Sequence, residues 1–287
     1  MCRGGSLRPL GQGTVDPERV TADDFLITDS HYGSRWSFYS CIHCGYVFSN
    51  PSIPAAELLR FYAQLDDREY AEEEVGRGRN FSAILNRLDD FPLPGKRLLD
   101  VGAASGIFLN LARKRGYEIL GIEPSRSLAA DARKRYGIEL FVGTLEELRD
   151  ERKFSVVTLL DILEHLSDPD GFMGRVSALT EEGGILVVVT PDIDSLAARL
   201  AGKKWWHFRI AHIAFFNRRS LRFLLEKNGF EIVDRRRYAW NFSLFYLLTR
   251  IFPRLKSFRS LQIKLKKLHL KLPLRDSWEI YARKRKT

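Results

Sequence analysis

The fold is decided by residues Arg97–Phe108, which read Arg-Leu-Leu-Asp-Val-Gly-Ala-Ala-Ser-Gly-Ile-Phe. The apolar run before Gly102 predicts a short buried strand, Gly102–Gly106 predicts a tight turn, and the apolar periodicity from Ile107 onward predicts a helix. Such a turn places backbone N–H groups at a helix N-terminus, where they bind an anionic group, and its glycines let a ligand approach closely. The sequence therefore predicts a cofactor site at this turn.

Two classes of cofactor use this arrangement, and the spacing of the glycines separates them. A dinucleotide fold requires Gly-x-Gly-x-x-Gly, but its second and third glycines would fall on Ala104 and Ile107. S-adenosylmethionine carries a sulfonium and an amino group, so an acid at the strand end, here Asp100, is favourable where it would repel a pyrophosphate. A second acid, Glu123, follows the next strand about 20 residues after the turn, where an acid accepts hydrogen bonds from ribose hydroxyls. The alternative is an αβ unit whose turn binds nothing, and both acids argue against it.

Two segments, Leu98–Gly106 and Gly121–Ser125, resemble class I S-adenosylmethionine-dependent methyltransferases of the small-molecule type, similar to ubiquinone-biosynthesis enzymes. The family's Gly-x-Gly is here Gly102-Ala103-Ala104, a mild departure. The resemblance implies an α/β fold, Rossmann-like and doubly wound, with a mostly parallel seven-stranded sheet. It also implies cofactor contacts from Asp100, Gly102, Ala104, Gly106, Glu123, Pro124 and Asp161, and adenine contacts from Thr144 and Leu145 in a later loop. That Thr144 and Leu145 only cap the following helix stays open.

The stretch Asp161-Ile162-Leu163-Glu164-His165-Leu166 follows a predicted strand, Phe154–Leu160. It places an acid and a histidine at the carboxyl end of a central strand, and it resembles the Asp-x-Leu-Glu-His segment of the same methyltransferases. A histidine with a pKa of about 6.5 can take a proton from a hydroxyl acceptor. Asp161 and His165 are therefore predicted to face the reacting centre, with His165 as general base. The alternative is a histidine that packs at a helix start, with Glu164 in a structural contact.

The connection 192–216 crowds aromatic residues and two histidines into one loop at the ligand edge of the sheet. Long loops at this edge usually carry function. We predict a lid over the acceptor pocket, lined by Trp205, His207 and His212, with His212 as a further catalytic candidate. Core packing of the aromatic side chains is the alternative.

The N-terminal 52 residues are predicted to form a small β module, with strand-like stretches at Phe25–Ile27 and Trp36–Tyr39. Its Cys41-Ile42-His43-Cys44-Gly45 knuckle is one half of a zinc-ribbon site, because tetrahedral zinc takes two thiolates from such a turn. Some bacterial methyltransferases look similar, with a second Cys-x-x-Cys pair ahead of the catalytic domain. The hypothesis is a zinc site formed by Cys2, Cys41, Cys44 and either His31 or a lost residue. Thiols that bind no metal are the alternative.

Residues 53–95 are predicted to cover the entrance of the sheet domain. Apolar periodicity predicts helices over Pro54–Tyr70 and Phe81–Phe91, and the charged segment Ala71–Asn80 is predicted to be a mobile loop near the cofactor. The methyltransferase domain then occupies 96–287, with its last two strands, Phe230–Tyr238 and Ser277–Arg283, as an antiparallel hairpin.

The net charge of +10 is concentrated at the C-terminus, because the residues from Arg235 onward hold 16 Lys and Arg against 2 acids. Within this part, the insertion 242–274 shows leucines at helical spacing with basic residues between them, interrupted by Pro253. A basic amphipathic helix can lie on an anionic membrane or against a lipid-linked substrate, or pack on its own domain or a second copy. Nucleic acid is a weaker candidate, because the apolar residues form a helical stripe instead of aromatic positions on a sheet.

The composition bounds the remaining properties. No run of about 18 apolar residues occurs, no secretory signal is present and three cysteines are too few for a disulfide framework, so we expect a cytoplasmic protein, with the inner face of the membrane as an alternative site. The function predicted is O-methylation of a small molecule, such as a sugar, a polysaccharide precursor or a lipid-linked intermediate. An RNA methyltransferase and a non-catalytic assembly protein with a cofactor fold are the alternatives.

Overall fold

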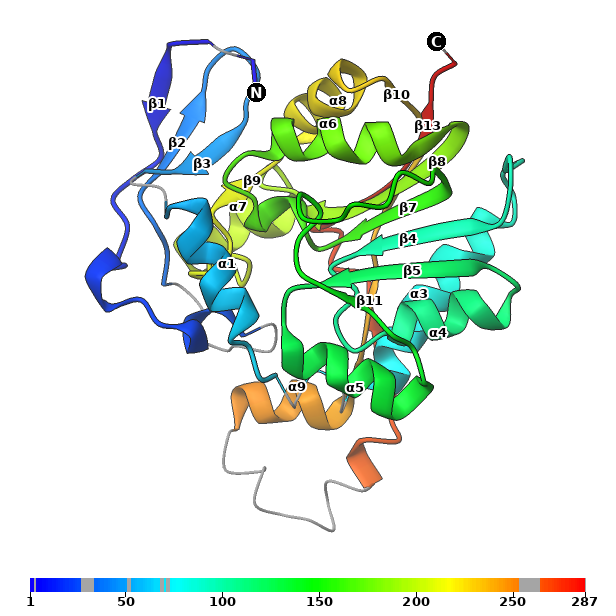
Figure 1. The fold of residues 1–287 in the computed structure, drawn as a ribbon. Coiled ribbons are helices and arrows are strands. Elements are labelled where there is room, and N and C mark those ends of the chain that lie inside the picture. The colour runs from blue at the N-terminus through cyan, green and yellow to red at the C-terminus, as the bar shows by residue number, and fades with distance from the viewer. Residues whose placement is uncertain are drawn as a thin grey trace.

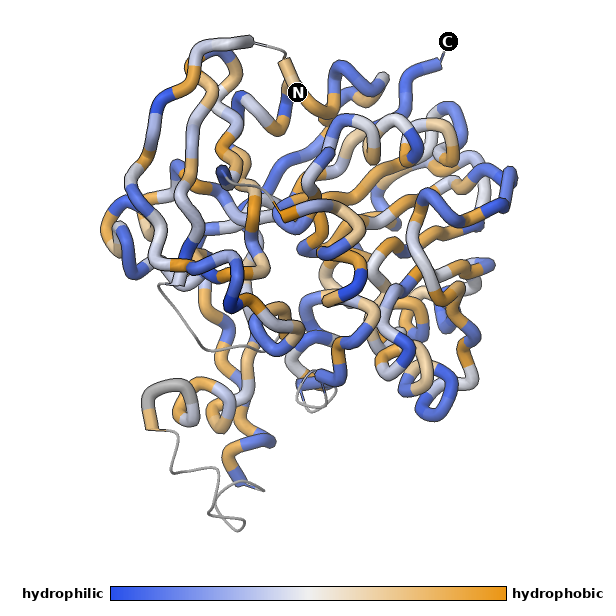
Figure 2. Tube along the Cα trace, turned by 60° about the vertical axis from the view of Figure 1, so that its left-hand side comes forward, coloured by the Kyte–Doolittle hydropathy of each residue, from blue (hydrophilic) through white to orange (hydrophobic). Residues whose placement is uncertain are grey.

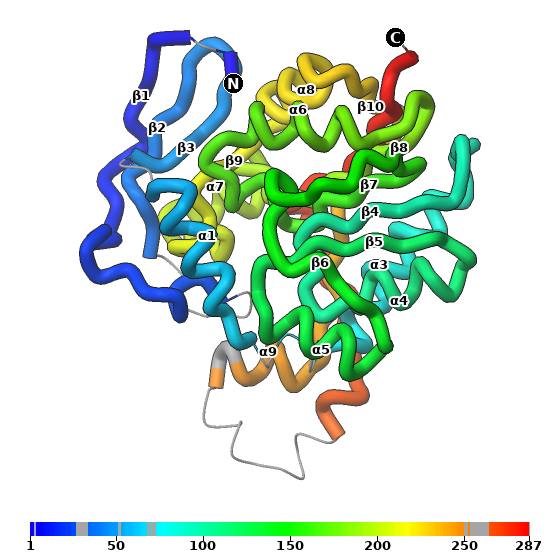
Figure 3. Tube along the Cα trace, viewed as in Figure 1, coloured from blue at the N-terminus to red at the C-terminus, as the bar shows by residue number. Residues whose placement is uncertain are grey.

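The computed structural model describes residues 1–2, 4–26, 34–50, 53–67, 70, 73–252 and 264–286. Its central sheet has the order β10-β13-β8-β7-β4-β5-β6 (Figures 1 and 3). The strands are β4 (Arg97–Val101), β5 (Glu118–Glu123), β6 (Phe141–Val142), β7 (Phe154–Leu160), β8 (Thr180–Pro191), β10 (Phe230–Arg237) and β13 (Ser277–Lys284). Strands β4 to β8 pair in parallel, whereas β13 is antiparallel to both β8 and β10. The predicted fold class and the terminal hairpin are confirmed.

Both faces of this sheet are covered by helices, because its strands alternate apolar side chains between two layers. Leu98 and Val156 face one core, with α3 (Glu74–Leu88), α4 (Ile107–Lys114) and α5 (Arg126–Tyr136). Leu99 and Val157 face the other core, with α6 (Pro169–Leu179) and α8 (Arg218–Lys227). Figure 2 shows the apolar strands at the centre of the molecule and hydrophilic turns around it.

Helix starts follow the local sequence. The side chain of Ser125 accepts a hydrogen bond from the backbone N–H of Leu128 at the start of α5. Asp168 caps α6 in the same way, with Pro169 in the first turn, and Asn217 caps α8. These residues satisfy backbone donors that the first helical turn leaves unpaired.

The N-terminal module forms its own sheet, and the 192–216 connection completes it. The order is β1-β2-β3-β9, with β1 (Leu7–Pro9), β2 (Phe38–Cys41), β3 (Val47–Ser49) and β9 (Ala214–Phe215). The connection also contains α7 (Leu196–Ala201) and the 3-10 turn η4 (Gly202–Lys204). Trp36 of the module and Trp205 of the connection lie in one core, with α1 (Ala55–Ala63) packed on it. Module and connection are therefore one packed unit.

The structure corrects several local predictions. The first cover helix, α1, ends at Ala63 and does not continue to Tyr70. The charged segment predicted as a mobile loop is helical from Glu74 onward. Gly76 of α3 packs closely on the backbone of Asn241, since an added Cβ would lie 2.5 Å from the Asn241 carbonyl oxygen. Near the N-terminus, the 3-10 turn η1 (Pro17–Arg19) precedes a second 3-10 turn, η2 (Ala22–Phe25). Phe25 of the strand predicted at Phe25–Ile27 therefore lies in a turn, and Ile27 lies outside the described residues.

The basic insertion, predicted as a helical pattern divided at Pro253, is only partly helical in its described residues. Strands β11 (Trp240–Ser243) and β12 (His269–Leu272) pair as a hairpin, and α9 (Leu244–Ile251) lies between them in the chain. Glu73 accepts hydrogen bonds from the backbone N–H (3.0 Å) and hydroxyl (2.6 Å) of Ser243, which holds the hairpin on the cover. Pro253, where the predicted helical pattern is interrupted, and His31, a candidate zinc ligand, lie outside the described residues. Among the described helices none has the length and apolarity needed to cross a bilayer.

Candidate active site

The predicted turn between β4 and α4 adopts a backbone that favours glycine. Gly102 and Gly106 have φ values of 77° and 74°, and Ala104 between them has a φ of 45°. A side chain at Gly102 would overlap the Cδ1 atom of Ile162. The turn is tied to the next strand, since the N–H groups of Gly102 and Ala103 both donate to the carbonyl of Ile122 at 2.9 Å. A left-handed alanine beside these glycines is a strained conformation of the kind found at ligand sites.

Glu123 lies beneath this turn at the end of β5. One carboxylate oxygen accepts the N–H of Ala104 at 2.8 Å, and the other accepts the N–H of Ser125 at 2.8 Å. Each oxygen keeps a further lone pair for a ligand hydroxyl. Burial raises the pKa of Glu123 to about 7. The carboxylate is thus oriented by the backbone, in a place where a polar ligand would compensate for lost water.

Asp100 is the second buried acid, at the end of β4. Its Oδ1 accepts a hydrogen bond from the hydroxyl of Thr158 on β7 at 2.6 Å. Burial, with the nearby charge of Glu123, raises the pKa of Asp100 to about 7. The carboxyl ends of adjacent parallel strands therefore bring two acids together, as an open sheet does at its ligand edge.

Asp161 continues this row at the end of β7, in a left-handed conformation with a φ of 58°. Burial raises its pKa to about 7, against the opposing charge of Arg77 on α3. The guanidinium of Arg77 lies 3.8 Å from the ring centroid of Tyr70. Within the described part of the chain, Nε of Arg77, Oδ1 of Asp161 and the hydroxyl of Ser105 are buried without a hydrogen-bond partner. These unpaired donors and acceptors are available to polar groups of a ligand or to ordered water.

His165 lies in the 3-10 turn η3 (Leu163–His165), and its tautomer is fixed by its neighbours. Its Nδ1 lies 2.8 Å from the carbonyl oxygen of Ala211 and 2.8 Å from the hydroxyl oxygen of Tyr62. A carbonyl only accepts, so Nδ1 carries the proton and Nε2 holds the lone pair. Burial lowers the pKa of His165 to about 4. The imidazole is therefore neutral at neutral pH, with Nε2 as the basic nitrogen.

The 192–216 connection, called the lid below after its predicted role, places two more histidines beside His165. The His212 ring is 4.8 Å from that of His165 and stacks on His207 at 5.7 Å. Burial, followed by the charges of His165 and Arg209, lowers the pKa of His212 well below its usual range. The structure thus brings together His165, His207 and His212, which the sequence predicted from separate segments.

Asp276, just before β13, holds the lid in this position. Its Oδ2 accepts hydrogen bonds from the indole N–H of Trp206 at 2.7 Å and from Nε2 of His207 at 3.0 Å. Its side chain is fully buried. A buried carboxylate that accepts two hydrogen bonds is costly to disconnect, so this contact fixes the lid against the sheet domain.

A family described as a methyltransferase domain matches residues 68–235 of the chain, which is more than half of its length. The chain belongs to this methyltransferase-domain family. The prediction of a class I S-adenosylmethionine-dependent methyltransferase is confirmed at the level of family and fold.

Individual relatives of this methyltransferase-domain protein are distant. A ubiquinone biosynthesis O-methyltransferase from Bradyrhizobium sp. (strain ORS 278) is 31% identical over 103 residues, or 34% of this chain and 41% of the relative. A SAM-dependent methyltransferase from Archaeoglobus fulgidus is 20% identical with a TM-score of 0.50, covering 76% of this chain and 100% of that one. The cyclase SpnF is 19% identical with a TM-score of 0.51, covering 73% and 82%. At these identities the two structures show the fold alone, and a fold does not fix a reaction.

The charged groups around this turn are chemically suited to S-adenosylmethionine. Glu123 would accept hydrogen bonds from ribose hydroxyls, Asp100 and Asp161 would face a sulfonium and an ammonium group, and Arg77 would donate to a carboxylate. Sequence analysis missed Arg77, because it assigned the charged segment Ala71–Asn80 to a loop. Of the predicted adenine contacts, Leu145 is buried in the core and Thr144 donates its backbone N–H to Glu147 at 2.8 Å. Pro124 lies directly between Glu123 and the capping Ser125.

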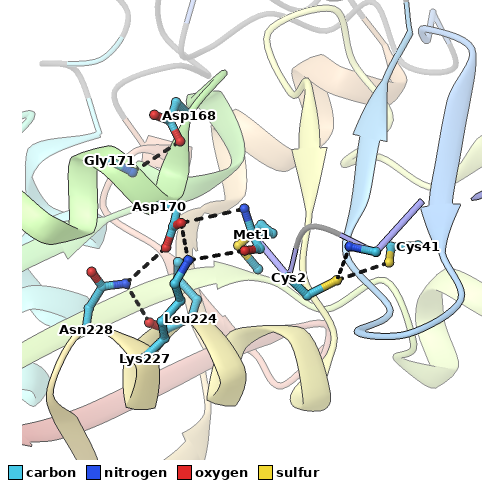
Figure 4. A network of polar contacts seen from close by, with 10 residues as sticks. Met1, Cys2, Cys41, Asp168, Asp170, Gly171, Leu224, Lys227 and Asn228 are labelled. Atoms are coloured by element: carbon cyan, nitrogen blue, oxygen red, sulfur yellow. Dashed lines mark hydrogen bonds and ion pairs between the residues drawn. The ribbon is translucent and has the colours of Figure 1, made fainter. Parts of the chain in front are cut away.

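Two clusters of metal-ligating side chains occur in the described residues of the methyltransferase. The sulfur atoms of Cys2, Cys41 and Cys44 all lie within 4.8 Å of one another, and those of Cys2 and Cys41 are 3.4 Å apart (Figure 4). Met1 is positioned by Lys227, whose ammonium group donates to the Met1 carbonyl at 3.2 Å.

The second cluster of metal-ligating side chains consists of Glu164, His165 and His212 beside the lid. The predicted lid residue Trp205, by contrast, is fully buried in the aromatic core.

Proposed function

We propose that the protein transfers a methyl group from S-adenosylmethionine to a hydroxyl oxygen of a small molecule. The observation that carries this proposal is His165, whose neutral ring presents Nε2 as a base while the carbonyl of Ala211 holds the proton on Nδ1. Such a group suits an acceptor that must lose a proton as it gains a methyl group. The name of the relative from Bradyrhizobium, an O-methyltransferase, supports the same reaction class.

The cofactor, when bound, supplies a methyl group already activated by a positive sulfur. The residues proposed to hold it are Asp100, Gly102, Glu123, Asp161 and Arg77. Glu123 would accept the ribose hydroxyls, and Arg77 would bind the carboxylate. The acids would surround the positive groups in a site that excludes water, where each electrostatic contact is strengthened.

The proposed work of the protein is then to orient the acceptor and to receive its proton. The acceptor O–H bond would break with its proton passing to Nε2 of His165, while the oxygen takes the methyl group and the methyl–sulfur bond of the cofactor breaks to leave S-adenosylhomocysteine. The resulting imidazolium is stabilised through Nδ1–H by the Ala211 carbonyl. Because the methyl group is already activated, alignment of the two reacting centres supplies most of the rate acceleration.

The proposed acceptor carries a ring. Trp240 and Phe242 of β11 stack at 5.7 Å with an interplanar angle of 7°, and Trp240 lies 6.4 Å from His207. Aromatic faces at this position favour a sugar, whose C–H groups pack on an aromatic ring, or a flat aromatic ring against the lid. Sugars, polysaccharide precursors and lipid-linked intermediates therefore remain the proposed substrate classes.

Two measurements test the proposed reaction. Calorimetric titration with S-adenosylmethionine, with NAD in parallel, should show binding of the first compound only. Turnover with a panel of hydroxyl-bearing acceptors should then release S-adenosylhomocysteine, and His165→Gln should lower kcat by about 10² to 10⁴ without loss of cofactor binding. If His165→Gln binds the cofactor and turns over as fast as wild type, His165 is not the general base.

We also propose that the insertion brings the enzyme to a membrane surface or a lipid-linked substrate. Leu268 and Leu270 are 56% and 45% exposed, with Lys267 and Lys271 beside them in the sequence. Exposed leucines among basic residues favour an anionic lipid interface. Sedimentation with phosphatidylglycerol vesicles should decrease in Leu268→Glu/Leu270→Glu, whereas Leu196→Glu should retain it. Equal sedimentation of all three proteins would contradict this role.

We also propose that the cluster of Cys2, Cys41 and Cys44 binds zinc together with a fourth ligand. Three thiolates within mutual reach suit tetrahedral zinc. Metal analysis of the purified chain should find about one zinc per chain, lost in Cys44→Ser and retained in Ile42→Ser, a substitution at an exposed neighbour. A zinc-free wild-type chain with normal stability would identify these cysteines as packed thiols.

A further inference from the structure

A cleft of about 290 Å³ lies where the N-terminal module meets the lid. The module contributes Arg35 and Phe38, and the lid contributes Arg199, Lys203 and Phe208. None of the described residues that line the cleft carries a carboxylate. It is separated from the histidines by an aromatic layer, since Trp205 packs between Phe208 (5.4 Å) and His207 (5.0 Å). The cleft is therefore distinct from the proposed methyl-transfer site.

Among the described residues, no acidic side chain balances the charge of this cleft. Arg35 is only 8% exposed, and its Nη2 donates to the backbone carbonyl of Gln12 at 3.0 Å, not to an acid. In the parts of the chain that the structure describes, no ion pair is formed by Arg35, Arg199 or Lys203. A largely buried guanidinium without a carboxylate partner is costly, and an anion that enters the cleft would offset that cost.

The geometry points to a particular kind of anion. Arginine presents a planar fork that matches two oxygens of a phosphate, and lysine adds a mobile point charge. The rings of Phe38 and Phe208 stack at 5.8 Å and form an apolar wall beside these cations. The volume lies near the lower limit for small-molecule sites, about 300 Å³. A compact ligand with a charged end and an apolar or ring-bearing remainder fits this lining.

We propose that this cleft binds a phosphate-bearing ligand, a phosphate or diphosphate ester, between the N-terminal module and the lid. Arg35, Arg199 and Lys203 contact the phosphate, and the remainder of the ligand lies on Phe38 and Phe208. Because the cations come from both segments, bound ligand stabilises the docking of the module on the lid. The ester is either a free metabolite or the headgroup of a lipid, since both present the same phosphate chemistry.

The test uses the full chain and inorganic pyrophosphate as the probe, in calorimetry at low salt. Arg199→Glu/Lys203→Glu reverses two exposed cations of the cleft, and Lys114→Glu/Lys134→Glu makes the same charge change on exposed positions of α4 and α5. We expect the first variant to bind pyrophosphate at least about tenfold more weakly than wild type, and the control to stay within about twofold. Thermal unfolding should shift upward with pyrophosphate in wild type and control only.

A second arm distinguishes the source of the phosphate. Vesicles of phosphatidylcholine with phosphatidic acid are compared with phosphatidylcholine alone. Binding that requires phosphatidic acid and is lost in Arg199→Glu/Lys203→Glu, without pyrophosphate binding, assigns the cleft to a lipid headgroup. Equal weakening in both variants, no binding in either arm, or displacement of pyrophosphate by S-adenosylmethionine would overturn the proposal. Cofactor binding, measured separately, tests the methyltransferase activity independently of this cleft.

Discussion

The hydroxyl oxygen of Tyr62 lies 2.8 Å from Nδ1 of His165 and ties the N-terminal cover to the carboxyl end of β7. Both residues also approach the carbonyl of Ala211 in the lid. Three segments of the chain thus meet at one imidazole ring. The base proposed for catalysis is oriented by residues outside the strand that carries it.

Removing the Tyr62 hydroxyl should therefore slow catalysis without affecting the cofactor. We expect Tyr62→Phe to lower kcat about fivefold, which corresponds to the loss of one hydrogen bond of about 1 kcal/mol. The dissociation constant for S-adenosylmethionine should not change. Steady-state kinetics and calorimetry on the same preparation measure both quantities. A variant with unchanged kcat but a lower melting temperature would show that the contact only stabilises the fold.

Two substitutions at the proposed cofactor turn should weaken the binding of S-adenosylmethionine. Glu123→Ala removes a carboxylate held by two backbone N–H groups, and we expect S-adenosylmethionine to bind about 100-fold more weakly, from the loss of charge-assisted hydrogen bonds. Gly102→Arg should abolish binding, because a side chain there overlaps Ile162. The matched control is Glu146→Ala, at an exposed acid of a nearby loop. Normal binding by both site variants would remove this turn as the cofactor site.

The raised carboxyl pKa values predict a pH dependence of stability. In the folded chain Asp100, Glu123 and Asp161 have pKa values of about 7, whereas the unfolded chain titrates at about 4. The folded state therefore holds protons that the unfolded state has released. Stability without cofactor should fall as the pH rises from about 4 to about 7 and then level off. Thermal unfolding between these limits measures this slope, which Glu123→Gln should reduce.

The same groups predict how cofactor affinity changes with pH. A sulfonium and ribose hydroxyls favour ionised carboxylates, so binding below pH 7 should release protons. Affinity should rise with pH up to about 7 and stay constant above it. Calorimetry in buffers of different ionisation enthalpy detects the released protons. Affinity that is independent of pH across this range would mean that these acids are already ionised in the free protein.

The lid offers a test of the acceptor side alone. Asp276→Asn keeps the shape of the side chain but weakens its hydrogen bonds to Trp206 and His207. We expect a loss of stability of about 1 to 3 kcal/mol and a rise in the KM of the acceptor, with cofactor affinity unchanged. Denaturant unfolding and acceptor kinetics measure these effects. An unchanged KM alongside lower stability would restrict Asp276 to a structural role.

The cofactor half of the site was predictable because its residues are local in sequence. Asp100 and Gly102 lie in one strand and turn, and Glu123 ends the next strand along the chain. Apolar periodicity fixed the order of strands and helices, and parallel pairing then brought both acids to one edge. Arg77 was missed because its charged segment was assigned to a loop, and the packing of α3 on the backbone of Asn241 is a contact that no local pattern reveals.

The sequence by itself determined the strand-turn-helix unit, the sheet domain and the two acids around the turn, because short-range periodicity and spacing encode them. Only the tertiary structure decided the acceptor side. Tyr62 and His165 are 103 positions apart, and His207 and Asp276 are 69 apart. Strand β9 of the lid joins the sheet of the N-terminal module, so the docking of two distant segments sets the positions of these histidines. Contacts of this kind form when separate apolar surfaces are buried together, and local sequence patterns do not specify them.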